Sequence, residues 1–209
     1  MQDKGQKVEM RYRLLEAKVA NKLFKPMPSD SLFQEVVDYY DSKGSANEKM
    51  EAHYLLGCIY RDMKEAPRAM QCYQEAVECA DTLKQDCDLV ALYKIYGQMA
   101  DVFVKQHLLQ EAQKAQEKYR NYALKAKDTL NYIIGSERLI TIFCAMGDTA
   151  KAMDQTKYCA YLYEKYHYPQ KAQAVCLTLI EFYLDRHQYP KAHHFMQKFE
   201  AKSGLFDEQ

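Results

Sequence analysis

The sequence predicts an all-α protein in which about ten helices form a solenoid of about five helical hairpins. The first observation is a repeat of small residues at intervals of 43, 40 and 40 positions, namely Ala69, Ala112, Ala152 and Ala192. The second is the low content of helix breakers, 7 Gly and 5 Pro in 209 residues, which suits short turns between helices. Hairpins that recur at such a period stack into a solenoid in which each repeat contacts its neighbours.

We expect a single domain over 1–209, whose first hairpin, at 7–44, diverges from the others. Pro26 ends the first helix near residue 23, because proline cannot continue a helix. One of residues 29–31 then caps the second helix, since serine and aspartate side chains accept hydrogen bonds from the free N–H groups of a helix start.

Four closer repeats follow, at about 46–84, 88–127, 128–167 and 170–204. Pro67 opens the second helix of the first repeat, where a missing N–H is harmless. Gly147 and Asp148 mark a helix end followed by a helix cap. A further cap is expected at Asp128, and the polar residues 81–88 make the loosest linker.

The stretch 52–80 carries the most specific pattern, which comprises Leu56, Gly57, Tyr60, Ala69, Tyr73 and Ala76. This set resembles the tetratricopeptide repeat (TPR). A glycine inside a helix costs about 1 kcal/mol relative to alanine, so we expect Ala69 of the facing helix to approach Gly57 closely. A HEAT-like repeat is the alternative, because its period is near 40 residues, but the Leu-Gly, Tyr and Ala set favours the TPR.

The TPR resemblance implies a right-handed superhelix whose first helices line a concave, peptide-binding groove. The usual period is about 34 residues, so the longer period here predicts a second helix one to two turns longer in each pair. The implied groove residues include Tyr54, Cys58, Arg61, Lys94, Asp101, Lys105, Glu137, Thr141, Leu177 and Glu181. Chaperone-binding arrays use a Lys and an Asn where Tyr54 and Cys58 stand, so their carboxylate clamp is not expected.

A narrower resemblance rests on the runs RYRLLEAKVANKL, SDSLFQEVVDYYDSKG and AHYLLGCIYRDMKEAPRAMQCYQEAV. They are similar to the TPR sensor regions of gut-bacterial exported lipoproteins and membrane-anchored regulators. The resemblance implies a periplasmic or membrane-anchored parent protein, with a cytoplasmic one as the alternative. No capping helix follows the last hairpin, so we expect a longer protein, self-association through the solenoid ends, or Leu205 and Phe206 folding back as a cap.

Composition excludes several function classes. The 29 basic and 29 acidic residues balance, which argues against nucleic acid as a partner. The sequence contains no run of 18 apolar residues, so we expect no membrane contact by this chain. The sequence has no zincin, nucleophile-elbow, phosphate-loop or dinucleotide motif, so we expect no enzyme, no cofactor and no metal site. The 7 cysteines contain no CxxC pair and are expected to be mostly small buried hydrophobes.

Two functions remain open. The first is a non-catalytic scaffold that binds a peptide or protein segment in the concave groove, as the sensing part of a larger bacterial envelope protein. The second is an intracellular TPR regulator that binds a peptide or a small effector. A basic stretch at 114–127 could serve an acidic peptide or nucleic acid, but a solvated helix face explains it as well.

Overall fold

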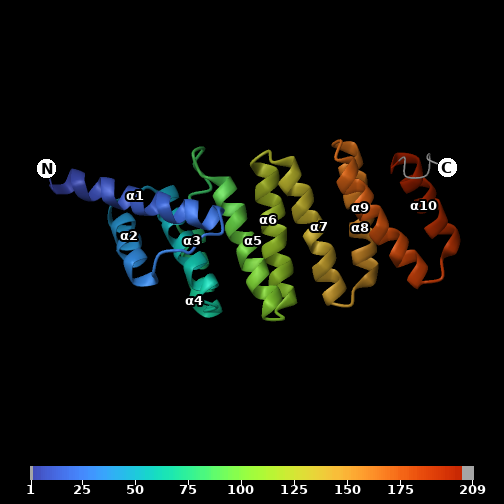
Figure 1. Ribbon diagram of the computed structural model, residues 1–209, viewed down its shortest axis with the longest axis horizontal. Helices are drawn as coiled ribbons and strands as arrows, with labels where there is room; N and C mark the ends of the chain where they lie inside the picture. Colours follow the sequence, from blue (N-terminus) through green and yellow to red (C-terminus); the bar gives the residue numbers. More distant parts are fainter. Residues whose placement is uncertain (1, 204–209) are drawn as a thin grey trace. The chain divides into compact units, whose positions relative to one another are not determined.

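The computed structural model describes residues 2–203, which contain ten helices and no strand (Figure 1). This confirms the all-α class, and the hairpins are those of a TPR-like solenoid. The chain divides into two compact units, Met1–Gln106 and His107–Gln209. The single domain expected over 1–209 stays a prediction.

The first unit consists of α1 (Gln2–Lys22), α2 (Asp30–Lys43), α3 (Ala46–Asp62), α4 (Ala66–Glu78) and α5 (Leu89–Lys105). Ser29 caps α2 by accepting a hydrogen bond from the Leu32 N–H, as one of the three predicted caps. Pro67 lies in the first turn of α4, as expected. The sequence reading missed the capping box at α3, in which Ser45 and Glu48 satisfy each other's backbone N–H groups.

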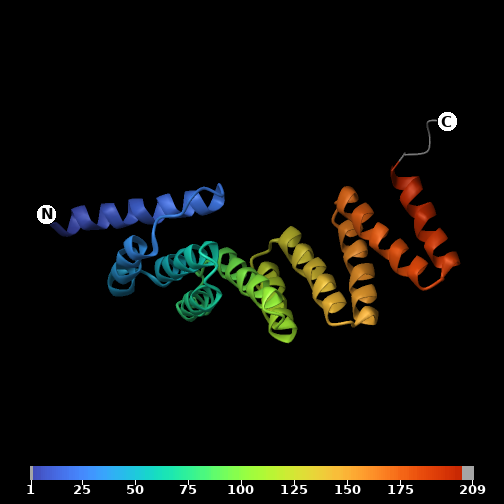
Figure 2. The same ribbon diagram turned by 60° about the horizontal axis from the view of Figure 1, so that its bottom comes forward.

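Helix α1 lies across both α2 and α3 instead of pairing with α2 alone (Figures 1 and 2). Met10, Leu14 and Ala17 are buried in a cluster with apolar residues of α2 and α3. Ion pairs tie the flanks of α1 to both helices, Arg13 to Glu35 on α2 and Lys18 to Glu51 on α3. The expected hairpin at 7–44 therefore takes the form of one long helix laid over two others.

The second unit consists of α6 (Leu109–Lys125), α7 (Thr129–Ala145), α8 (Thr149–Lys165), α9 (Pro169–Asp185) and α10 (Tyr189–Ser203), each packed against the next. Helices of 17 residues, from α6 to α9, alternate with three-residue turns. The expectation of a longer second helix is wrong, because α8 has the same 17 residues as α7, and α4, with 13, is shorter than α3, with 17.

The turns of the second unit share one backbone form. Their middle residue is left-handed, with φ of 57° at Lys127, 75° at Gly147, 61° at His167 and 55° at His187. The next N–H then bonds to the carbonyl five residues earlier, as from Asp148 to Phe143 at 2.9 Å, which satisfies a carbonyl at the helix end. The predicted caps are confirmed, since Asp128 and Asp148 each accept from a backbone N–H of the following helix.

The repeated alanines are confirmed as core positions, because Ala69, Ala112, Ala152 and Ala192 are at most 1% exposed. The close approach at Gly57 is confirmed too, although the nearest group differs from the expected one. A Cβ added at Gly57 would lie 2.5 Å from Tyr73 Cε1 and 3.3 Å from the Ala69 carbonyl oxygen.

Two further predictions concern the C-terminal end of the chain and membrane-spanning helices. The last predicted repeat ends at residue 204, and this residue and the expected cap residues Leu205 and Phe206 lie outside the described residues. Within residues 2–203, no helix is both long enough and apolar enough to span a bilayer.

Candidate functional site

The structure distributes the predicted groove residues over both units. Tyr54, Cys58 and Arg61 lie on α3, Lys94, Asp101 and Lys105 on α5, Glu137 and Thr141 on α7, and Leu177 and Glu181 on α9. Those of the first unit include the most elaborate polar contacts, which centre on Arg61.

Arg61 joins three helices through its guanidinium. It donates to Gln98 Oε1 of α5 at 2.9 Å, to Asn21 Oδ1 of α1 at 3.1 Å, and to Asp62 Oδ1 at 2.8 Å. Its side chain is 26% exposed, so part of the cation still faces solvent. Arg61 therefore fixes the crossing of α1, α3 and α5 and leaves a partly open positive charge there.

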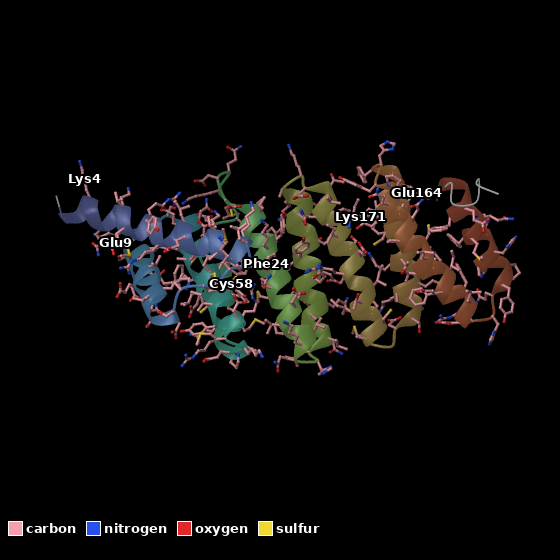
Figure 3. The ribbon with its side chains drawn as sticks, viewed as in Figure 1. Lys4, Glu9, Phe24, Cys58, Glu164 and Lys171 are labelled. Carbon is pink, nitrogen blue, oxygen red and sulfur yellow. The ribbon has the colours of Figure 1, made fainter. Side chains whose placement is uncertain are left out.

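Cys58 lies on α3 (Figure 3), and neither Cys58 nor Tyr54 lines an open surface, because Cys58 is buried and Tyr54 is only partly exposed. Cys58 is fully buried, and its sulfur accepts weak hydrogen bonds from Tyr73 at 3.9 Å and Arg61 at 3.7 Å. Burial raises the pKa of the Cys58 thiol, and burial likewise raises the pKa of the Tyr54 phenol. Both groups are thus neutral packing partners for Arg61, and Cys58 has no surface to offer a ligand.

A small basic pocket lies beside Arg61, between the α3–α4 turn and the end of α5. Its volume is about 200 Å³, and its lining residues are Arg61, Lys64, Ala66, Ala69, Val102, Lys105 and Gln106. Three of these side chains are cations, and the described residues that line the pocket include no carboxylate. We call this cavity the basic pocket.

The start of α4 adds to the positive potential of the basic pocket. Ala66 is the first residue of α4, and Glu65 before it provides no side-chain cap, so the positive end of the helix dipole is not offset by a capping side chain. Asp62 offsets one of the three cationic charges through its pair with Arg61. The remaining excess of Lys64 and Lys105 favours a carboxylate or phosphate group as occupant.

The sequence predicted Arg61 and Lys105 as groove residues but missed Lys64. Lys64 is the middle residue of the α3–α4 turn, with φ of 64°, and no helical periodicity points to a turn position. Only the left-handed backbone of this turn, which the structure shows, brings Lys64 to the basic pocket.

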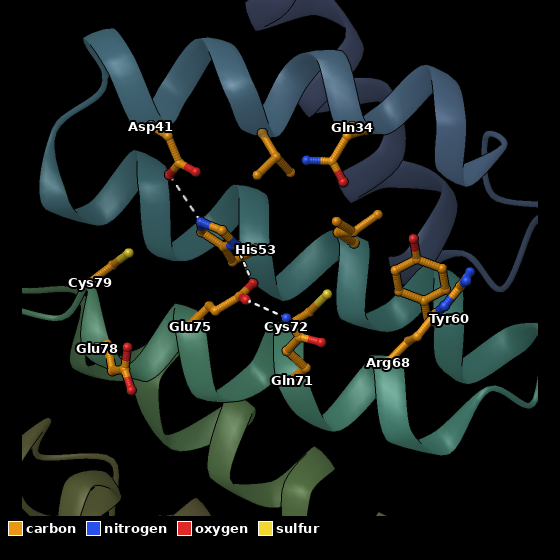
Figure 4. Close-up of a pocket in the computed structure, with 12 residues that line it drawn as sticks. Gln34, Asp41, His53, Tyr60, Arg68, Gln71, Cys72, Glu75, Glu78 and Cys79 are labelled. Carbon is orange, nitrogen blue, oxygen red and sulfur yellow. Dashed lines mark hydrogen bonds and ion pairs between the residues drawn. The ribbon is translucent and has the colours of Figure 1, made fainter.

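A larger cavity of about 650 Å³ lies between α2, α3 and α4 (Figure 4). His53, 8% exposed, sits between two carboxylates in its wall. Its Nε2 is 2.9 Å from Asp41 Oδ1, and its Nδ1 is 3.2 Å from Glu75 Oε2 without the alignment of a hydrogen bond. Gln71 donates to the other oxygen of Glu75 at 2.9 Å.

The other end of this larger cavity carries Arg68, which stacks over the Tyr60 ring at 5.3 Å. Two thiols, Cys72 and Cys79, also line it, and burial raises the pKa of Cys72 to about 12. Among the described residues, no group of three or more His, Cys, Asp or Glu side chains is arranged to hold a metal ion. No sequence motif points to this cavity, because its polar residues come from three helices.

The predicted groove residues of the second unit are less organised. Glu137 accepts a hydrogen bond from the Tyr163 hydroxyl at 2.5 Å and is held by it. Thr141, Leu177 and Glu181 are exposed, with Leu177 at 44%. These three side chains offer a mixed surface rather than a defined site.

Comparisons with known proteins match the fold alone. No family model matches the chain, and no curated protein matches its sequence. Among solved structures, a Podosopora anserina protein assigned as a kinesin light chain with nearly identical TPR-like repeats superposes with a TM-score of 0.70. The identity is 14%, over 96% of this chain and 97% of that chain.

Two further structures come from longer proteins. Aspartyl phosphate phosphatase F from Bacillus subtilis has a TM-score of 0.69 and 14% identity, over 96% of this chain and 52% of that chain. A Rap protein complexed with competence and sporulation factor has a TM-score of 0.57 and 14% identity, over 96% of this chain and 55% of that chain. At this identity the likeness establishes a TPR-like fold.

Proposed function

We propose that this chain is a non-catalytic interaction module that binds a segment of another protein and holds a carboxylate of that segment in the basic pocket. The observation that carries the proposal is the convergence of Arg61, Lys64 and Lys105 on one cavity. A volume of about 200 Å³ suits one acidic side chain or a chain terminus rather than a whole cofactor.

The fold supports this proposal because stacked helical hairpins present extended surfaces that bind other chains. A Rap protein with the same fold is complexed with competence and sporulation factor, which supports a binding role for such arrays. Because a phosphatase also has this fold, a catalytic role is the alternative to this proposal. The envelope location belongs to the proposal as an expectation, whereas the other predicted groove residues, Lys94 and Glu181 among them, lie outside the pocket that the proposal assigns to the carboxylate.

The experiment selects peptides of about twelve residues from a random phage library on the immobilised chain and measures their affinity by fluorescence anisotropy. We expect enrichment of Asp, Glu or a free C-terminal carboxylate. Lys105→Glu should weaken binding of a selected peptide at least tenfold, which corresponds to about 1.4 kcal/mol. Lys94→Glu, an exposed charge reversal on the same helix outside the basic pocket, is the matched control.

The two variants separate the possible results. Loss with Lys105→Glu and retention with Lys94→Glu support the basic pocket. Equal loss with both variants supports a broad electrostatic surface instead. An unchanged affinity in Lys105→Glu, or a selection with no acidic preference, overturns the proposal.

A small effector in the larger cavity is the second candidate, favoured by its volume of about 650 Å³, which falls in the range of small-molecule sites. Asp41, Glu75 and Glu78 on its wall favour a cationic compound. A thermal shift with spermidine or arginine that disappears in Glu78→Gln would support this candidate, and the absence of any shift would remove it for these ligands.

A further inference from the structure

Helix α1 carries a second apolar face that nothing in its own unit covers. Val8, Tyr12, Leu15 and Val19 are between 42% and 69% exposed, although the buried face of the same helix is made of Met10, Leu14 and Ala17. We call these four exposed residues the α1 stripe. A helix that is apolar on two opposite faces normally has a partner on each.

The spacing of the α1 stripe is that of a coiled-coil seam. Its residues follow at intervals of four, three and four positions, which places Tyr12 and Val19 at a and Val8 and Leu15 at d of a heptad. An open hollow of about 550 Å³ runs beside Tyr12, Leu15 and Val19, with Pro26 at its end. The face is thus shaped to receive side chains of another helix.

The charges that flank the α1 stripe differ in sign from one edge to the other. Within α1 the g positions carry Lys4, Arg11 and Lys18, and the e positions carry Glu9 and Glu16. Figure 3 shows Lys4 and Glu9 on opposite edges of α1. In a parallel pair each g residue faces the e residue of the next heptad on the partner, whereas an antiparallel pair brings g against g and e against e.

We propose that the α1 stripe is the interface of a parallel, in-register dimer of this chain. Lys4 of one copy then faces Glu9 of the other, and Arg11 faces Glu16. An antiparallel dimer would oppose lysines and arginines to one another and glutamates to one another, so the charge pattern selects the parallel form. The buried face of α1 points α2 and α3 of each copy away from the seam.

The flanking charges are free enough to make these contacts. Arg11 lies 3.6 Å from Glu48 and also contacts the Tyr40 hydroxyl, yet 52% of its side chain is exposed. Glu9 accepts a hydrogen bond from Arg13 and is 54% exposed. Because α1 is already folded against α2 and α3, dimerisation does not have to fix its backbone. The stripe is short, so we expect an affinity in the micromolar range.

Sedimentation velocity over protein concentrations from about 5 to about 200 µM tests the dimer, since this range brackets the affinities of small interfaces. We expect a monomer–dimer equilibrium, and we expect Leu15→Glu to raise the dissociation constant of the dimer at least tenfold. Leu177→Glu is the matched control, because Leu177 is 44% exposed and Leu15 is 42% exposed. Circular dichroism confirms that both variants remain helical.

Cysteine cross-linking tests the direction of the pair. Val8→Cys and Val19→Cys are made in a background with Cys79, Cys87 and Cys144, the cysteines that are not buried, replaced by serine. A parallel dimer lets each variant form a disulfide with itself under mild oxidation. An antiparallel dimer instead joins the two variants only when they are mixed.

The outcomes decide the proposal. Self-linked Val8→Cys and Val19→Cys together with dissociation by Leu15→Glu support it. A strict monomer at every concentration overturns the dimer and assigns the α1 stripe to a different partner. A dimer that survives Leu15→Glu, or one that cross-links only in the mixture, overturns this interface or its direction.

Discussion

Gly57 of α3 lies directly against the ring of Tyr73 of α4, so close that a Cβ at Gly57 would be 2.5 Å from Tyr73 Cε1. Tyr73 is fully buried, and its hydroxyl donates toward Cys58 on the same helix as Gly57. The ring therefore cannot swing into solvent when a side chain is added. This contact positions α4 against α3 and, with it, the turn that carries Lys64.

Gly57→Ala should lower the free energy of unfolding by about 1–3 kcal/mol, because the added methyl overpacks the hairpin. Urea unfolding followed by circular dichroism measures the change. Gly5→Ala is the control, since a Cβ there meets no atom within 4 Å and alanine favours the helix. A neutral or stabilising Gly57→Ala would show that the two helices are not held at this distance.

Gly135 of α7 is packed in the same way against Tyr119 of α6. A Cβ at Gly135 would lie 2.7 Å from Tyr119 Cδ1 and 3.3 Å from Arg120 Cα, which is backbone and cannot rotate away. We expect Gly135→Ala to cost about 1–3 kcal/mol in urea unfolding. If the same substitution left the unfolding transition in place, α6 and α7 could not be as close as the structure has them.

The left-handed turns of the second unit predict that removing a glycine destabilises the protein and that introducing one stabilises it. Gly147→Ala should destabilise by about 1 kcal/mol, because the backbone is left-handed there although a Cβ has open space. Lys127→Gly in the equivalent turn should stabilise by up to about 1 kcal/mol. Melting temperatures of the two variants measure this contrast, and shifts of the same sign would contradict it.

The cysteines should differ in reactivity and in their effect on stability with pH. Burial raises the pKa of Cys159 to about 12 from the ordinary value of 9.0, whereas Cys144 is exposed. Cys144 should therefore react with a thiol reagent in the native protein, and Cys159 only after unfolding. Mass spectrometry of the labelled peptides distinguishes the two.

The sign of the pH effect follows from that raised pKa. Above about pH 9 the Cys159 thiol ionises in the unfolded chain but not in the folded one, so its contribution to stability is lost as pH rises toward 12. Cys159→Ala should flatten the fall in unfolding free energy over this range. An unchanged slope would mean that Cys159 is not buried as described.

Local sequence signals predicted the helix order well. Pro67, Asp128 and the Gly147-Asp148 pair act within one turn of the chain, so their effect is readable without tertiary structure. The helix lengths were misjudged because the extra residues of the long period were assigned to the second helix alone. In the repeat at 128–167 both helices have 17 residues, so the extra length is shared between them.

The candidate site was less predictable than the fold. Arg61 and Lys105 could be assigned to one surface from the repeat, but the basic pocket also needs Lys64 and the start of α4. The position of α1 over α3 was missed because α1 has two apolar faces, and a pattern cannot say which face is buried. Tertiary contacts between distant segments decide both points.

Amide hydrogen exchange with and without a selected acidic peptide tests the proposed function most directly. We expect the peptide to slow exchange at 61–66 and 102–106, the two segments that meet at the basic pocket, and to leave the turns of the second unit unchanged. Lys105→Glu should abolish that protection at the same peptide concentration. Protection elsewhere in the chain with none at these two segments would contradict the proposed site.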